Sequence, residues 1–309
     1  MRDYSNNFEQ LRKQLSSELG DRRYIDIRRN LRPRYSLIWC DLVFSHILLW
    51  SSVWFSYMFS RWFFVPLWAL LIGLFLHRLS LFLHEGAHFL LAPTKRLNDW
   101  LCDVLVSPLV LTSVASYRPG HMLHHRHLGE TNDPERSYHS ALNRRFVFSG
   151  LLGANVLRVV SARPQAQSDT EDVRRVITPL AGVFIYLSLF VLGLMQSNLL
   201  YAASIILGVL SVFPAVGSIR QLLEHRAESS HFVSPADGPI SRMFPFLPFG
   251  WLVGAAGFDR HLLHHWDPGI SYTQLANLER QLAQTSAGAI IAARRTTYWS
   301  CFCDLWSWS

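Results

Sequence analysis

Apolar residues in this chain are concentrated in four long stretches with few polar interruptions. The stretches cover residues 36–59, 62–83, 176–195 and 199–218. A helix needs about 20 mainly apolar residues to cross the hydrocarbon core of a bilayer, so each stretch predicts a membrane span. Only residues 59–61 and 196–198 separate the members of each pair, and loops this short predict antiparallel neighbours. The pattern therefore predicts an all-α integral-membrane protein built as a four-span helical bundle.

Two shorter apolar stretches are predicted not to span. Residues 100–116 contain Asp103 and Pro108, and residues 244–257 contain Pro245 and Pro248. Both stretches have basic residues on each side, a pattern typical of interfacial or re-entrant segments. If neither stretch crosses the membrane, all the histidine-rich regions of the chain lie on one side of it.

The basic residues predict which side that is. Nine Lys and Arg lie in residues 1–35, eleven in 92–176 and seven from 219 onward, against one in 59–61 and none in 196–198. Cytoplasmic loops carry the excess of Lys and Arg, so both short loops are predicted to face outward and both termini the cytoplasm. Residues 1–35 then form a basic cytoplasmic segment and 276–309 a cytoplasmic tail. Because the start is polar, we expect no cleavable signal peptide.

Composition agrees with a lipid-embedded chain and limits its partners. Half of the 309 residues are hydrophobic, with 11 Trp, 10 Tyr and 20 Phe. The net charge of +7 is explained by a cytoplasmic face beside anionic lipid, so no nucleic-acid partner is expected. The four cysteines show no C-x-x-C spacing and are expected to be reduced packing residues.

The stretch LHEGAH places His84 and His88 four residues apart, on one face of a helix that continues out of the second span. H-E-x-x-H is also the signature of a zinc metalloprotease, in which Glu85 would be the general base. That interpretation requires a third ligand downstream and leaves the remaining histidine clusters without a role.

Two further clusters share the pattern H-x-x-H-H, at residues 121–125 and 261–265. Spacings of three and four residues direct imidazoles from one helix toward one point or two adjacent points. His225, about two turns after the fourth span, is a further candidate. One ion takes roughly four to six ligands and rarely more than four imidazoles, so nine converging histidines predict two metals. A site rich in imidazole and without thiolates favours iron.

These boxes, in this order around four spans, resemble the integral-membrane fatty acid desaturase superfamily, which also contains lipid hydroxylases and carotenoid hydroxylases and ketolases. HHRHLGETNDPE at 124–135 resembles the second box of the family, and HHWDPGISYTQL at 264–275 resembles the third. The resemblance extends from about Leu37 to Leu275, and the combination of boxes is far more specific than any one of them.

The resemblance implies a desaturase-like domain over residues 36–275, a helical bundle with a cytoplasmic helical cap, and a di-iron centre at their junction. Two iron ions (Fe2+/Fe3+) would be held by His84, His88, His121, His124, His125, His225, His261, His264 and His265. The assignment of His225 has the weakest support, because it depends on a single Glu-His pair in a helix after the fourth span. The di-iron centre is the catalytic group, and no separate acid or base is proposed.

Several residues beside the boxes are candidates to orient the ligands by hydrogen bonds to the outer ring nitrogens. These possible supporting residues are His77, His127, Glu85, Glu130, Asp133, Glu224, Asp259 and Asp267. For each of them, a solvated, capping or packed side chain remains the alternative.

The resemblance implies an O2-dependent oxidoreductase of lipid metabolism, and HHWDPGISY favours a fatty acyl desaturase over the alternative, a lipid or carotenoid hydroxylase or ketolase. The substrate would be a lipid or acyl chain taken from the membrane. The sequence contains no fused electron carrier that its motifs reveal, so we expect a separate donor, a ferredoxin, a rubredoxin or a b-type cytochrome.

Overall fold

The computed structural model describes residues 6–162, 172–226, 241–245 and 249–306. Every regular element within these ranges is a helix, and the only bridges are isolated ones, Leu142 with Trp306 and Met243 with Arg295. Four helices among the described residues are long and apolar enough to cross a membrane. The predicted all-α class with four spans is therefore confirmed.

Three of the four spans are longer than the apolar stretches that predicted them. The first, α2 (Tyr35–Met58), has the predicted length shifted by one residue, and the third is α8 (Arg174–Met195). The second joins the 3-10 turn η1 (Trp62–Phe64) to α3 (Val65–Ala87). The fourth runs through α9 (Leu199–Leu207), the π-helix η4 (Gly208–Val212) and α10 (Phe213–His225).

The side chains of these helices present a wide apolar surface. Only 17% to 44% of the most apolar window of each span is buried within the chain. Trp54, Leu180 and Phe184 are among the large apolar side chains left outside, at 59%, 60% and 71% exposure. Water does not favour so much exposed apolar area, whereas the hydrocarbon of a bilayer does.

The chain divides into two compact units. The spanning unit contains residues 36–119 and 145–219, and the histidine-rich unit contains residues 1–35, 120–144 and 220–309. The chain passes between them at the starts of α2 and α6 (Arg144–Leu151), inside α5 (Val114–His127) and inside α10.

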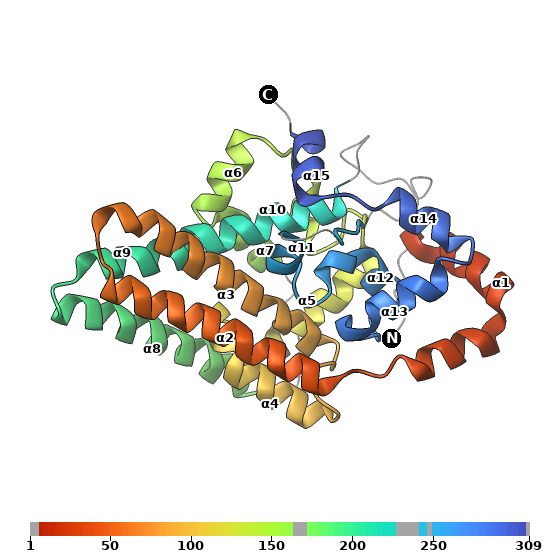
Figure 1. Cartoon of the computed structure of the whole chain (residues 1–309), viewed down its shortest axis with the longest axis horizontal. Coiled ribbons are helices and arrows are strands. Elements are labelled where there is room, and N and C mark those ends of the chain that lie inside the picture. Colours follow the sequence, from red (N-terminus) through yellow and green to blue (C-terminus); the bar gives the residue numbers. More distant parts are fainter. Residues whose placement is uncertain (1–5, 163–171, 227–240, 246–248, 307–309) are drawn as a thin grey trace. The chain divides into compact units, whose positions relative to one another are not determined.

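In the spanning unit, α3 packs against α9 and η4, and α8 packs against α9 (Figure 1). The approach of α3 to η4 is close, since a Cβ built on Gly73 would lie 2.8 Å from the Gly208 carbonyl oxygen. Arg78, almost fully buried in α3, pairs with Asp41 and donates to Ser45 Oγ, both on α2. A buried charge inside a span requires such a partner.

The same unit carries several short helices: α4 (Lys95–Leu105), η2 (Ser107–Val110), α6 (Arg144–Leu151) and α7 (Ala154–Ala162). Helix α4 buries Asn98 and Cys102 and leaves Leu97, Trp100 and Val104 exposed. An apolar face that points outward on a short helix fits a membrane surface. Residues 100–116 are not among the candidate spans, as predicted.

The histidine-rich unit is built on α1 (Asn6–Asn30), η3 (Arg136–His139), α11 (Phe249–Val253), η6 (Phe258–Arg260), α12 (His261–Trp266), α13 (Tyr272–Leu282), α14 (Ala287–Ala293) and α15 (Tyr298–Leu305). Helix α1 bends at Gly20, whose φ is 67°. Leu15 and Leu31 lie in one core cluster with Leu263 and Leu282. Both ends of the chain therefore contribute to this core. In the other predicted surface segment, α11 is short and residues 246–248 lie outside the described residues.

Candidate metal centre

Seven histidines meet in the interior of the histidine-rich unit. Helix α5 carries the second box and α12 the third, while α10 ends on His225. The helical spacing places the three imidazoles of each box toward one side of its helix. All seven side chains are buried: His121, His124, His125, His225, His261, His264 and His265.

The first group consists of His121, His125 and His264. One ligand atom from each lies within 4.8 Å of the others. The Nε2 atom of His125 is 3.0 Å from Nε2 of His121 and 3.2 Å from Nε2 of His264. The second box and the third box therefore contribute to one cluster, although 139 positions separate His125 from His264.

The second group consists of His124, His225 and His265, again with ligand atoms within 4.8 Å of one another. His261 adjoins it, because its Nε2 atom is 2.9 Å from Nε2 of His225 and 3.1 Å from Nε2 of His265. His225, the weakest candidate from the sequence, lies inside the cluster.

The donor set of each group fits a metal ion. A neutral imidazole has one N–H and one lone pair, so several Nε2 atoms that converge on each other cannot all be satisfied by mutual hydrogen bonds. Ligands about 2.1 Å from one ion lie about 3 Å apart, which is the spacing found here. Imidazoles without thiolates suit iron, among other transition metals. Each group is therefore a candidate site for a metal ion.

Burial keeps these imidazoles in the form that binds metal. Loss of solvent lowers the pKa of His121 to about 3. Burial also lowers the pKa of His261 well below its usual range, and the neighbouring His265 lowers it further. Neutral rings with free lone pairs are the protonation state that a metal requires.

Carboxylates support two rings of the second box. Asp133 lies 2.8 Å from Nδ1 of His124, and the Tyr138 hydroxyl donates to Asp133 at 2.5 Å. Glu135 lies 3.8 Å from Nδ1 of His121 and accepts a bond from the Gln221 amide. Asp133 was a predicted supporting residue, whereas Glu135, Tyr138 and Gln221 were not. Glu135 lies two residues after Asp133 in the NDPE stretch at the end of the second box. Its place in this box could have indicated a supporting role.

The other predicted carboxylates have varied surroundings. Glu224 is buried 3.8 Å from Nε2 of His261 and also contacts Arg220 and Tyr298. Asp259 pairs with Arg260, and burial raises its pKa to about 6.

The three remaining acidic or histidine candidates outside the first box make other contacts. Asp267 accepts from the Tyr24 hydroxyl at 2.8 Å and from Arg28, both on α1. His127 pairs with Glu130 at 2.8 Å, and both side chains are partly exposed. They form a surface pair.

The first box belongs to the spanning unit, at the end of α3. The imidazole ring centroids of His84 and His88 are 4.9 Å apart, as the spacing of four residues predicts. Glu85 is buried, with a carboxylate oxygen 3.9 Å from Nδ1 of His84. His77 is buried further back in α3, facing Gly217. The assignment of His84 and His88 to the same metal pair as the other seven histidines stays a prediction.

The fold and the buried imidazole groups define a helical membrane protein with a candidate transition-metal centre. The model of the family described as fatty acid desaturase matches residues 60–297, which is most of the chain. The chain therefore belongs to the fatty acid desaturase family, a family of membrane-bound oxidoreductases, and it is an integral membrane protein. Comparisons with curated proteins and with solved structures gave no match. Family membership argues against the zinc protease interpretation of HEGAH.

Proposed function

We propose that the protein is a non-haem di-iron enzyme that uses O2 to desaturate a fatty acyl chain in the membrane. The observation that carries the proposal is the gathering of seven buried imidazoles in clusters that could hold metal ions, in a chain of the fatty acid desaturase family. An iron pair supplies the oxidising power that removal of hydrogen from an unactivated methylene requires.

We assign the histidines of the second and third boxes and His225 to the two ions, and we propose His84 and His88 of the first box as the remaining ligands. His121, His125 and His264 alone leave a shell of roughly four to six ligands incomplete, and two more imidazoles would fill it. The residues of the chain bind the ions, and Asp133 holds the proton of His124 Nδ1 so that Nε2 presents its lone pair.

The substrate is proposed to be an acyl chain that enters from lipid. The exposed apolar surface of the spans supports this, since a membrane-dissolved substrate reaches such a protein without leaving hydrocarbon. The irons, both termini and the electron donor are proposed to lie on the cytoplasmic side, because Lys and Arg are concentrated in the segments outside the two short loops.

Electrons are proposed to come from a separate ferredoxin, rubredoxin or b-type cytochrome that docks on the basic cytoplasmic face. Complementary charge accelerates such encounters and makes them sensitive to salt. Reconstitution of the purified protein with each donor in turn, followed by O2 consumption, identifies the one that supports turnover.

Lipid profiling of a host that expresses the chain tests the reaction. We expect acyl chains with a new double bond, absent from a host that expresses His264→Ala. A new hydroxyl or keto group on a lipid or carotenoid would instead identify the alternative activity of this family. No new lipid, despite a loaded metal centre and a functioning donor, would overturn the proposal.

A further inference from the structure

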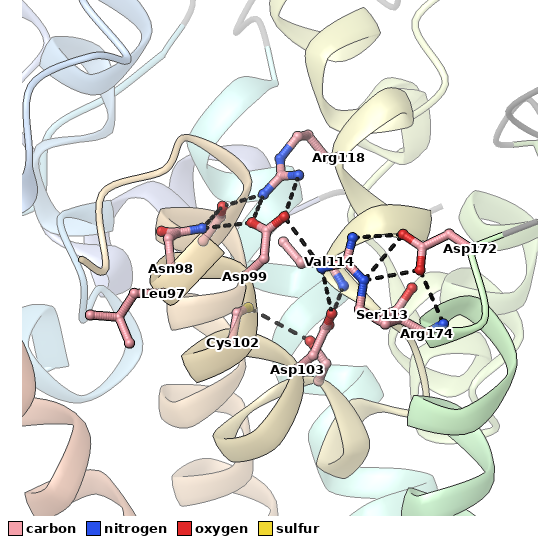
Figure 2. Close-up of polar contacts among 12 residues, drawn as sticks. Leu97, Asn98, Asp99, Cys102, Asp103, Ser113, Val114, Arg118, Asp172 and Arg174 are labelled. Carbon is pink, nitrogen blue, oxygen red and sulfur yellow. Dashed lines mark hydrogen bonds and ion pairs between the residues drawn. The ribbon is translucent and has the colours of Figure 1, made fainter. Parts of the chain in front are cut away.

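A polar network in the spanning unit links α4, the start of α5 and the start of α8 (Figure 2). Its centre is Arg118, in the first turns of α5, whose guanidinium group contacts Asp99 on α4. All the residues of this network belong to the spanning unit. None of them is among the metal ligands assigned above.

Arg118 binds the backbone at the end of α3. Its Nε donates to the Ala87 carbonyl at 2.9 Å, and its Nη2 donates to the Gly86 carbonyl, also at 2.9 Å. The Asn98 amide donates to the same Gly86 oxygen at 2.9 Å. The Gly86 oxygen also accepts from the Phe89 N–H at 3.2 Å, in the turn that ends the helix. The last carbonyls of a helix carry partial negative charge, so a cation suits this position. Gly86 and Ala87 lie between His84 and His88 in sequence.

The residue after His88 has an unusual backbone conformation. Phe89 has a φ of 61°, in the left-handed region that side chains other than glycine seldom adopt. The Arg118 guanidinium lies 3.8 Å from the centre of the Phe89 ring, and the Leu91 N–H donates to Asn98 Oδ1 at 2.9 Å. Arg118 therefore contacts the side chain of this turn and Asn98 binds its backbone.

The position of Arg118 is itself fixed by acidic residues. Asp99 accepts from Arg118 and also pairs with Arg174 at 3.4 Å, at the start of α8. Arg174 lies 3.6 Å from Asp103, which in turn accepts from the Val114 N–H at 2.7 Å. Figure 2 shows these groups as one connected set of contacts between α4, α5 and α8. A planar guanidinium presents five N–H donors in a fixed fork, a geometry that the three rotatable donors of an ammonium do not reproduce.

We propose that Arg118 is a positioning residue for the first histidine box, and that Asp99 orients Arg118. By holding the carbonyls of Gly86 and Ala87 and the Phe89 turn, the guanidinium fixes the rotation of the last turn of α3. The imidazoles of His84 and His88 are thereby aimed before metal binds. This inference rests on the proposed function, in which these two imidazoles are iron ligands.

The test compares Arg118→Lys, Arg118→Ala and Asp99→Asn with the wild type. Arg96→Ala is the matched control, since Arg96 is an exposed arginine on α4. Each purified full-length protein is loaded with 57Fe, challenged with a chelator and examined by Mössbauer spectroscopy. Loss of a residue that supports metal ligands typically lowers metal affinity 10- to 100-fold. We expect all three variants to lose about one of the two irons at a chelator level that the wild type and Arg96→Ala withstand. The Mössbauer signal of the other iron should persist.

Addition of guanidinium ion at millimolar concentration should restore the lost iron to Arg118→Ala but not to Asp99→Asn. The inference would be overturned if Arg118→Lys and Asp99→Asn retained both irons as Arg96→Ala does. Equal loss of both irons, without restoration by guanidinium, would also overturn it, because that result describes general unfolding. If Arg118→Ala does not fold, the Lys and Asn variants decide the outcome. A wild type that binds no iron would instead contradict the proposed function.

Discussion

In the proposed metal centre, His124 is oriented by Asp133. Its Nδ1 lies 2.8 Å from Asp133, so the ring proton is held on that side and Nε2 is left as a ligand atom. Tyr138 donates to the same carboxylate, and the pKa of its hydroxyl is raised well above its usual range by burial and by the charge of Asp133. Both contacts keep the proton of His124 on Nδ1 and the proton of Tyr138 on its hydroxyl.

Replacement of Asp133 by Asn should therefore weaken metal binding without removing a ligand. The amide retains the size of the side chain but loses the charge that orients His124, and such losses typically cost 10- to 100-fold in metal affinity. Chelator titration of the iron-loaded protein measures the change. Glu130→Gln is the control, because Glu130 pairs with the partly exposed His127. Equal iron retention in both variants would contradict the role of Asp133.

Spacing predicted the six histidines of the two H-x-x-H-H boxes, and a single Glu-His pair after the fourth span indicated the seventh, His225. The boxes are local patterns, and a helix converts spacings of three and four directly into a shared face. Glu135 and Gln221 could not be predicted in the same way. Their contact joins residues 86 positions apart, and it depends on how the chain turns after α5 rather than on a local period.

Helices α3 and α10 extend beyond the apolar stretches that predicted them, to Ala87 and His225. Hydropathy marks where apolar side chains end, but a helix continues as long as its backbone bonds and packing are favourable. The π-helix η4 ends two residues before Pro214 and was not predicted. Proline lacks the N–H that an α-helix requires, which accounts for the local change in bonding.

The contact between α3 and η4 predicts that Gly73→Leu destabilises the spanning unit. Any side chain there would meet the Val212 side chain and the Gly208 carbonyl. Overpacking of this kind typically costs about 1–3 kcal/mol. Thermal unfolding in detergent should show the loss, whereas Leu70→Met, at an exposed position of the same helix, should have little effect. Unchanged stability of Gly73→Leu would show that the helices do not approach so closely.

The attachment of α1 to the third box predicts the effect of Tyr24→Phe. The Tyr24 hydroxyl donates to Asp267, a buried carboxylate that also accepts from the Gly269 N–H. Leaving a buried acceptor with one donor fewer typically costs about 1–3 kcal/mol. Hydrogen exchange of α1 should become faster in Tyr24→Phe and stay unchanged in Ile25→Ala, whose side chain is exposed. Equal exchange in both variants would argue against this attachment.

The whole molecule combines a spanning unit with a unit assembled from three separate parts of the chain. The spans were predictable because hydropathy is a property of continuous segments. The composition of the histidine-rich unit was not, since Leu15 and Leu31 join a core whose other members include Leu278 and Leu282. Such contacts depend on long-range packing, for which a single sequence contains no local signal.

Membrane orientation gives a prediction for the whole molecule. In a variant without native cysteines, Ser60→Cys and Ser197→Cys should react with an impermeant thiol reagent added outside intact cells. Ser286→Cys and Ser300→Cys, at two exposed positions, should react only after permeabilisation, because the C-terminal segment is predicted to be cytoplasmic. The reverse pattern would contradict the proposed topology.

The metal content of the purified, full-length protein is the most direct test of the proposed di-iron centre. We predict about two irons per chain by elemental analysis, since two imidazole groups are each suited to one ion. His264→Ala should reduce this content and abolish lipid oxidation. One zinc per chain, together with proteolytic activity that survives His264→Ala, would contradict the proposal of a di-iron desaturase.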